Sequence, residues 1–148
     1  MRTPPLRAPI EGLTIYPVRS DDDAAAAIGW LTQGHPIVAV DTETTGLDFH
    51  ADVRLVQFGD QQTAWVMDPH RWLAPVEMLV FSEIPLVAHN APFDMLHLAR
   101  LLEPDNVVEA VTTLMERTTD TSILAHLIDP RERKDGGIGH GLKNLAEE

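Results

Sequence analysis

The chain has 148 residues, 44% of which are hydrophobic, and its formal net charge at pH 7 is −12. This length and composition predict one globular domain with a core of its own, and the apolar runs are too short and too interrupted to cross a membrane. Because cysteine is absent, disulfides, thiolate metal sites and cysteine nucleophiles are excluded. No apolar stretch near the N-terminus suits a secretory signal, so we expect a soluble cytoplasmic protein.

The first third of the chain predicts a lead-in, an edge strand and a helix. Residues 1–12 contain three prolines and few side chains that could pack, which predicts a flexible lead-in, with residues 13–148 forming a single domain. Residues 13–17 alternate in hydrophobicity and predict a short edge strand. Ser20 is placed as the N-cap of a helix over residues 24–31, and the three aspartates that follow it suit capping and solvation of the first turn.

The middle of the chain predicts a run of strands. Residues 37–40 are continuously apolar, as in a central strand, while residues 54–59 and 63–67 alternate and flank a turn. These three segments predict a three-stranded antiparallel meander. A short helix over residues 72–81 is expected to pack on the sheet, followed by a fourth strand over residues 85–88.

The last third predicts alternating helices and strands. Pro92 at a first helical position predicts a helix with a broad apolar face, and residues 107–111 predict a fifth strand. Thr119 or Asp120 is expected to cap a helix that ends before Pro130. A charged, glycine-rich loop over 131–140 and a further helix over 141–148 complete the chain. This order predicts an α/β fold, a mixed sheet in which the meander is joined by parallel strands, with helices on both faces.

Two carboxylates stand at the end of the first meander strand. Asp41 and Glu43 are two residues apart, and a strand projects such residues on one face. Two anions held this close repel each other and raise one pKa unless a cation lies between them. Surface solvation is the competing interpretation of this pair. Asp94, in the first turn of the predicted helix that follows the fourth strand, is the candidate third acid, although acids in first turns also serve the helix dipole.

These segments resemble known exonuclease motifs. Asp41-Thr-Glu43-Thr-Thr-Gly-Leu47 is similar to the first motif of the DEDD superfamily of 3′→5′ exonucleases, and His89-Asn90-x-x-Phe93-Asp94 is similar to the second. The segment from Asp120 to Pro130, the basic glycine loop and the stretch 140–146 resemble the proofreading domain of family A DNA polymerases, found in bacteria and their phages. The second motif alone looks equally like the proofreading subunit of the replicative polymerase.

The resemblance implies an RNase H-like fold, catalysis and a set of ligands. It implies that DNA is hydrolysed from its 3′ end with the help of two divalent cations, Mg²⁺ or Mn²⁺. The catalytic and metal-binding residues would be Asp41, Glu43 and Asp94. The residues implied to contact the single-stranded DNA 3′ end are Thr44, Leu47, Asn90, Phe93 and Lys143. For Leu47 and Phe93 ordinary core packing is the alternative.

The resemblance also implies a partner and a missing part. A net charge of −12 disfavours DNA binding, because affinity for phosphates comes mainly from Lys and Arg. A polymerase domain or subunit, in cis or in trans, would supply the positive charge that this chain lacks. The third motif, Tyr-x-x-x-Asp or His-x-x-x-x-Asp, is absent after the second motif, and no tyrosine follows Tyr16. We therefore expect a C-terminally incomplete domain, cytoplasmic in a bacterium or in the host of a phage.

Two other functions stay open at this point. The chain could be a stand-alone exonuclease of DNA or RNA that a partner or second copy completes. It could also be a non-catalytic relic that serves as a binding or structural domain. Asp120 is the nearest candidate for the fourth acid, and a helix N-cap is the simpler interpretation of it.

Overall fold

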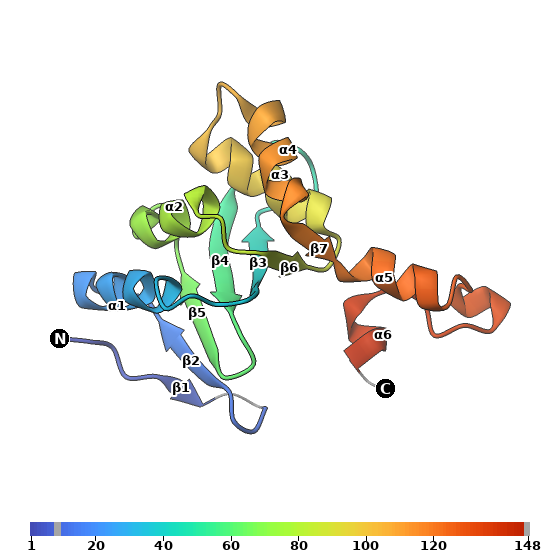
Figure 1. Cartoon of the computed structure of the whole chain (residues 1–148), viewed down its shortest axis with the longest axis horizontal. Coiled ribbons are helices and arrows are strands. Elements are labelled where there is room, and N and C mark those ends of the chain that lie inside the picture. Colours follow the sequence, from blue (N-terminus) through green and yellow to red (C-terminus); the bar gives the residue numbers. More distant parts are fainter. Residues whose placement is uncertain (8–9, 147–148) are drawn as a thin grey trace.

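The structure, a computed structural model, describes residues 1–7 and 10–146. Within them one seven-stranded sheet has the order β1-β2-β5-β4-β3-β6-β7 (Figure 1). The strands are β1 (Leu6–Arg7), β2 (Thr14–Pro17), β3 (Val38–Thr44), β4 (Val53–Gly59), β5 (Thr63–Met67), β6 (Leu86–Ala88) and β7 (Thr118–Asp120). The helices are α1 (Asp21–Leu31), α2 (Leu73–Phe81), α3 (Ala91–Leu102), α4 (Val107–Glu116), α5 (Thr121–Ile128), α6 (Leu142–Ala146) and the 3₁₀ helix η1 (Arg133–Asp135). None of these helices has the length and hydrophobicity that crossing a bilayer requires.

The pairing of the strands confirms the predicted mixed sheet. Strands β3, β4 and β5 form an antiparallel meander. β6 pairs parallel with β3, and β7 pairs parallel with β6. On the other side β2 pairs parallel with β5, and β1 closes that edge in antiparallel orientation. The carboxyl ends of β3 and β6 therefore point to the same edge of the sheet, which is where α/β sheets build their sites.

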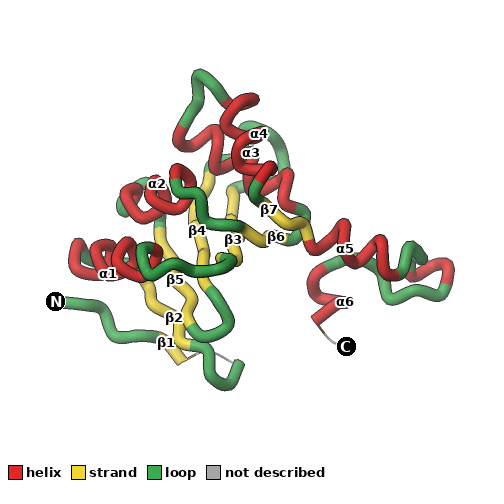
Figure 2. The backbone as a smooth tube through the Cα atoms, viewed as in Figure 1, coloured by secondary structure: helices red, strands yellow, loops and turns green. Residues whose placement is uncertain are grey.

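One face of the sheet carries the core. Val38 and Val40 of β3 and Val56 and Phe58 of β4 point to this face and are buried. They belong to one hydrophobic cluster with side chains of α1, α2, α3 and α4, which lie over the sheet in the tube view (Figure 2). Between the inward residues of β3, Ala39 and its alternate neighbours are exposed on the opposite face. The candidate site lies at the carboxyl end of β3, where buried and exposed side chains alternate.

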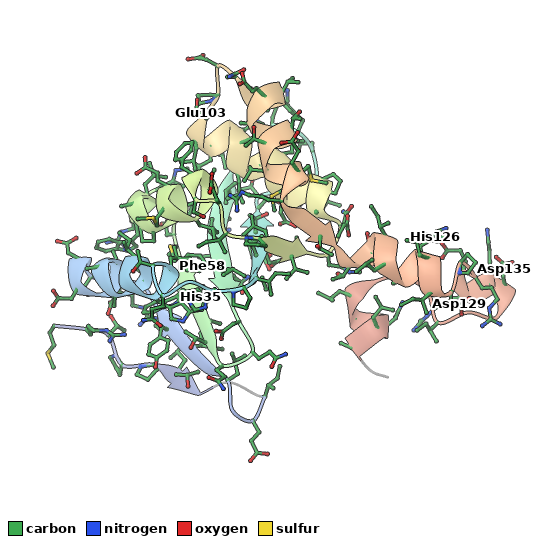
Figure 3. The ribbon with its side chains drawn as sticks, viewed as in Figure 1. His35, Phe58, Glu103, His126, Asp129 and Asp135 are labelled. Carbon is green, nitrogen blue, oxygen red and sulfur yellow. The ribbon has the colours of Figure 1, made fainter. Side chains whose placement is uncertain are left out.

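The last elements form an arm that extends from the β7 edge of the sheet. Figure 3 places His126, Asp129 and Asp135 on this arm, away from the sheet. Neither α5 nor α6 contains a buried residue, whereas every helix from α1 to α4 does. The arm folds back so that Leu142, at the start of α6, lines a cleft together with Asp41 of β3. The arm therefore reaches the margin of the sheet face that the first four helices leave exposed.

The expected strand over residues 107–111 was wrong, because this segment begins α4. Val107, Ala110, Val111 and Leu114 repeat at helical spacing and pack against the core. Three β-branched valines suggested a strand, yet burial of one helical face outweighs that propensity. The strand that does follow β6 is β7, only three residues long, which offers too short a pattern to recognise.

The flexible lead-in predicted for residues 1–12 also needs correction where the structure describes it. Leu6–Arg7 forms β1, and both the amide and the hydroxyl of Thr3 donate to Asp23, at 2.7 and 2.5 Å. Asp23 is buried, and although burial alone would raise its pKa, the bonds from Thr3 and Ser20 hold that pKa well below its usual value. One of the three aspartates thus anchors the lead-in. Residues 8–9, and the end of the helix expected over 141–148, lie outside the described residues.

Candidate metal-dependent nuclease site

The first two acids of the site lie on the exposed face of β3. Asp41 and Glu43 are both exposed and Thr42 between them is buried, which confirms the predicted alternation. Gln57, opposite Asp41 on β4, donates from its side-chain nitrogen to the Asp41 carboxylate at 3.3 Å. Partial burial raises the pKa of Asp41, and the negative charge of Glu43 raises it further. The pair is therefore a concentration of negative charge with one neutral donor beside it.

The third acid reaches the same place from α3. Asp94 lies in the first turn of α3, is 3% exposed, and accepts hydrogen bonds from the Thr42 amide at 2.8 Å and the Thr42 hydroxyl at 2.6 Å. Burial raises the pKa of Asp94, the Thr42 hydroxyl counters that rise, and the charge of Asp41 adds to it. Since Thr42 separates Asp41 from Glu43, these two bonds bring the second-motif acid to the first-motif pair.

The chemistry of these residues fits a divalent cation. Three carboxylates are the hard oxygen ligands that Mg²⁺ and Mn²⁺ prefer, and a bound cation would offset the burial and the repulsion that raise the pKa values of Asp41 and Asp94. One oxygen of Asp94 is occupied by Thr42. Across the described ranges no three histidine or acidic side chains lie close enough together to enclose one ion. The ligand types fit, and a closed three-ligand cage is not assembled.

Asp120 holds the turn from which Asp94 starts. Its two carboxylate oxygens accept from the amides of Asn90 at 3.0 Å and Ala91 at 2.9 Å, and one of them also accepts from the Ser122 amide at 2.8 Å and the Ser122 hydroxyl at 2.7 Å. Burial alone would raise the pKa of Asp120, but these hydrogen bonds, led by those from Ser122, lower that pKa. The predicted N-cap of α5 is confirmed. With both oxygens engaged, Asp120 is a poor fourth metal ligand.

Asn90 shows how tightly this turn is shaped. It has φ 62° and is the one described non-glycine residue with positive φ. Its own side chain makes no capping bond to α3. The left-handed conformation is uncommon outside glycine and persists where the surroundings impose it. Here the surroundings include Asp120, which receives the amides that the N-terminus of α3 would otherwise leave without partners.

The residues predicted to contact nucleic acid lie on three different elements and the loop after β3. Thr44 ends β3, and its hydroxyl donates to the Gly46 carbonyl at 2.5 Å. Leu47 is 91% exposed in the following loop, so it does not pack in the core. Asn90 is exposed at the start of α3, and Phe93 is half-buried with its ring 4.4 Å from that of His97. Lys143 is exposed on α6, next to the residue that lines the cleft.

The loop that carries Leu47 is fastened to α3. The Arg100 guanidinium donates to the carbonyls of Phe49 and Ala51, and it lies 4.7 Å from the Phe49 ring centre. Nε2 of the buried His97 contacts the Asp48 carbonyl at 3.3 Å. One helix therefore holds both Asp94 and the base of the exposed loop. Sequence reasoning missed this link because nothing in the motif spacing brings residues 48 and 97 together.

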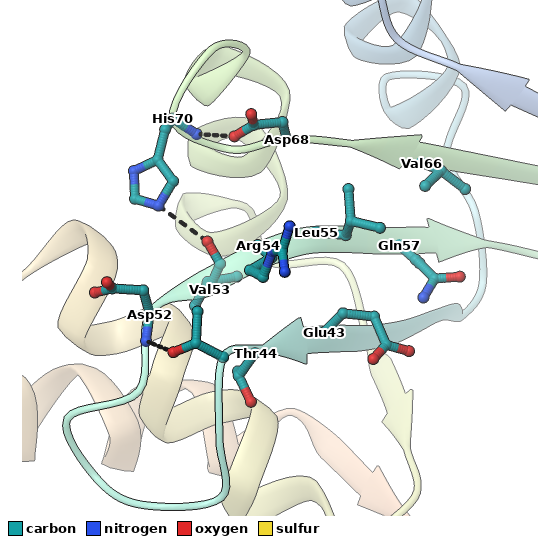
Figure 4. Close-up of a pocket in the computed structure, with 11 residues that line it drawn as sticks. Glu43, Thr44, Asp52, Val53, Arg54, Leu55, Gln57, Val66, Asp68 and His70 are labelled. Atoms are coloured by element: carbon teal, nitrogen blue, oxygen red, sulfur yellow. Dashed lines mark hydrogen bonds between the residues drawn. The ribbon is translucent and has the colours of Figure 1, made fainter.

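Two clefts flank the carboxylate pair on the exposed face. A cleft of about 830 Å³ lies on the Glu43 side and is lined also by Thr44, Arg54 and His70 (Figure 4). A cleft of about 440 Å³ lies on the Asp41 side, bordered by His89 of the second motif. Asp41, Glu43 and His89 thus border space that is open to solvent, whereas the buried Asp94 lines neither cleft.

Sequence comparison identifies the family. Residues 16–148 match the family model described as 3′-5′ exonuclease. The chain is 35% identical to the DNA polymerase of Mycobacterium phage L5 over 148 residues, which cover 95% of this chain and 24% of that polymerase. It is also 35% identical to the DNA polymerase of Mycobacterium phage D29 over 156 residues, covering 97% of this chain and 24% of that protein. The chain spans about a quarter of the length of these relatives.

Solved structures share the fold. Escherichia coli RNase D, an exoribonuclease involved in structured RNA processing, matches with a TM-score of 0.63 at 20% identity over 90% of this chain and 32% of that chain. Brucella melitensis NrnC with bound Mg²⁺ matches with a TM-score of 0.53 at 27% identity over 76% of this chain and 52% of that chain. The RNase H-like α/β sheet expected from the motifs is confirmed by these neighbours. By its sequence match, the chain belongs to the 3′-5′ exonuclease family.

Proposed function

We propose that this chain removes nucleotides from the 3′ end of a DNA strand as the proofreading module of a DNA polymerase. Its relatives in two mycobacteriophages are DNA polymerases, which supports a polymerase domain in the same polypeptide or in a partner. The observation that carries the proposal is the pair of bonds from Thr42 to Asp94, because they bring the acid of the second motif to the two acids of the first.

The proposed ligand set consists of Asp41, Glu43 and Asp94, which would hold two Mg²⁺ or Mn²⁺ ions. When bound, such ions activate a water molecule and neutralise the leaving oxygen in phosphodiester hydrolysis. The Mg²⁺ reported in NrnC supports this choice. Thr42 orients Asp94, and Gln57 donates to Asp41 and restricts its rotation.

The strand itself would be held by residues around the acids. Leu47, exposed on its fastened loop, would insert between bases, and Thr44 and Asn90 would offer polar groups to the strand. Phe93 lies one residue before Asp94, and Lys143 brings a positive charge at the start of α6. Single-stranded DNA is bound in this way elsewhere, by stacking surfaces combined with cations.

The tyrosine and acid of a third motif are not among these residues. The chain has a single tyrosine, Tyr16, whose ring stacks on Trp65 at 4.9 Å, and Trp65 belongs to the core. We therefore expect this chain alone to bind metal weakly and to hydrolyse DNA poorly or not at all, because one carboxylate and the group that orients the water are not among its residues. Fast, Mg²⁺-dependent degradation of an oligonucleotide by the chain alone would contradict this expectation.

Calorimetric titration with MnCl₂ tests the metal site. The wild-type chain should bind Mn²⁺, and both Asp41→Asn and Asp94→Asn should abolish binding because each removes a ligand. Asp105→Asn is the matched control, since Asp105 is exposed in the loop between α3 and α4 and changes the net charge equally. Absence of Mn²⁺ binding by the wild type, or binding that survives both substitutions, would favour the non-catalytic relic instead.

A cleavage assay tests the substrate. End-labelled DNA and RNA oligomers of one sequence are incubated with the wild type and with Asp41→Asn in MgCl₂. Slow shortening of the DNA from its 3′ end, lost in Asp41→Asn, supports the proposal. Faster shortening of the RNA would instead support a stand-alone ribonuclease.

A further inference from the structure

A β-bulge lies directly opposite the first motif. Glu43 pairs with Leu55 and Thr44 pairs with Val53, so Arg54 is the extra residue of β4 that no residue of β3 opposes. Bulges change which way a side chain points, and they recur next to active sites. Val53 is buried, whereas Arg54 and Leu55 in succession are both exposed. The bulge therefore keeps the Arg54 side chain on the solvent side at the level of Glu43.

Arg54 lines the larger cleft together with Glu43 and Thr44 (Figure 4). Among the described residues that border the clefts on either side of the acids, it is the one arginine or lysine. The same cleft is bordered by the carboxylates of Asp52 and Asp68. Within residues 1–7 and 10–146 Arg54 makes neither an ion pair nor a side-chain hydrogen bond, so its guanidinium has all its donors available.

Five other arginines of the described chain are engaged elsewhere, and the exposed Arg19 and Arg71 line neither cleft. The five engaged side chains donate to carbonyl or carboxylate oxygens or lie over aromatic rings, in Arg2, Arg100, Arg117, Arg131 and Arg133. A chain with a net charge of −12 that binds a polyanion needs positive charge at the point of contact. Arg54 is placed where that charge is needed, beside the acids and not on the distant arm.

We propose that Arg54 binds a phosphate of the DNA strand beside the carboxylates, an inference that rests on the proposed exonuclease function. A guanidinium presents parallel N–H donors that match two oxygens of a phosphate. Such a contact positions the backbone and carries no sequence information. Arg54 is thus a binding residue that offsets the repulsion between the acidic cleft and the incoming strand.

Fluorescence anisotropy with a 5′-labelled thymidine decamer in CaCl₂ tests the contact. Arg54→Gln should weaken binding by about 10-fold, the value of a charge-assisted hydrogen-bond pair, and should reduce the slope of log K against log salt by about 0.7. Arg54→Lys keeps the charge and loses the paired donors, so its affinity for the decamer should fall between those of wild type and Arg54→Gln. Arg19→Gln is the matched control, because this substitution removes the same charge from an exposed residue that lines neither cleft.

A second probe separates phosphate binding from general effects. The same decamer with uncharged methylphosphonates at its 3′-terminal linkages should bind equally to wild type and Arg54→Gln. Equal losses on both probes, or equal losses in Arg54→Gln and Arg19→Gln, would refute the role of Arg54 while leaving the exonuclease proposal intact. No binding of either probe by a wild-type chain would contradict the proposed function and this inference together.

Discussion

At the scale of single residues, Thr42 lies on the buried face of β3 between two acids on the exposed face. Its side chain points toward the helices and meets Asp94, while its neighbours Asp41 and Glu43 point to solvent. Asp94 is therefore bonded to the residue between Asp41 and Glu43 from the buried face of the strand. Burial raises the pKa values of Asp41 and Asp94, and the charge of Glu43 adds to the first rise and that of Asp41 to the second, so each carboxylate, when ionised, lowers the stability of the metal-free protein.

Asp41→Asn should consequently stabilise the metal-free chain. A carboxyl whose pKa is raised by folding contributes stability at low pH, and that contribution is lost as the pH rises from its ordinary value of 3.8 through the raised pKa. At pH 7 in EDTA the neutral amide avoids this cost, and we expect the melting temperature to increase by about 2 °C. Differential scanning calorimetry measures the change.

The pH and metal dependence of that melting temperature provide the controls. The difference between wild type and Asp41→Asn should vanish below pH 3.8, where the carboxyl is protonated in both the folded and the unfolded chain. MnCl₂ should raise the melting temperature of the wild type and leave that of Asp41→Asn unchanged. Asp105→Asn should match the wild type throughout; a metal-free Asp41→Asn chain that melts lower than wild type would refute the electrostatic account.

At the scale of elements, Asp120 joins two helices. It caps α5 through Ser122, and it accepts the amides at the start of α3. The helix that bears Asp94 therefore begins on a carboxylate supplied by the end of β7, a strand that pairs with β6 at this level. Movement of α5 relative to the sheet would be transmitted to the turn before Asp94.

Asp120→Ala should destabilise the chain by about 2–3 kcal/mol, because two helix caps are lost and buried amides are left without partners. Ser122→Ala, which removes one hydroxyl donor and leaves the amides of Asn90 and Ala91 paired, should cost about 1 kcal/mol or less. Urea denaturation monitored by circular dichroism measures both. Equal costs for the two variants would show that the bonds to the start of α3 contribute nothing.

The elements that sequence patterns predicted well are those with a clear period. The meander strands alternate or run apolar, and α1, α2, α3 and α5 begin near the residues that capping and proline signals indicated. Residues 107–111 failed because β-branched propensity and helical spacing disagree there, and packing against the core decides for α4. β7 was missed because three residues carry no period.

The candidate site was predictable as far as motif residues go. Asp41, Glu43 and Asp94 were named from spacing and resemblance, and the structure adds that Asp94 bonds to Thr42, the residue between the other two; their role as metal ligands stays a prediction. Thr42, Gln57 and the wider role of Asp120 were not predicted, because hydrogen bonds between distant segments depend on strand register. The bulge at Arg54 also depends on register, and a one-residue shift moves a side chain to the other face.

At the scale of the whole molecule, stability is concentrated in the sheet and its first four helices. Those elements share one hydrophobic cluster, whereas α5 and α6 contain no buried residue. Large apolar side chains of α5 are exposed, with Leu127 at 74% and Ile128 at 86%. The arm is therefore attached to the domain mainly through its first residues at the end of β7.

Hydrogen exchange should report this division. Amides of residues 121–146 should exchange faster than those of residues 38–67, because helices with few buried contacts open without unfolding the core. Mass spectrometry of peptides from the intact chain measures both ranges in one sample, so the meander serves as the internal control. Equal protection of the arm and the meander would contradict the division.

The order of strand pairing has a consequence for folding kinetics. β3, β4 and β5 are consecutive and antiparallel, so Asp41, Glu43 and Gln57 come together through local contacts. Asp94 arrives only with the parallel pairing of β6 on β3, which requires a crossover through α2. Non-local parallel pairing forms slowly. Repulsion between Asp94 and Asp41 would then arise after the meander has formed. Removing that repulsion, as Asp41→Asn does, should therefore slow unfolding more than the same substitution speeds folding.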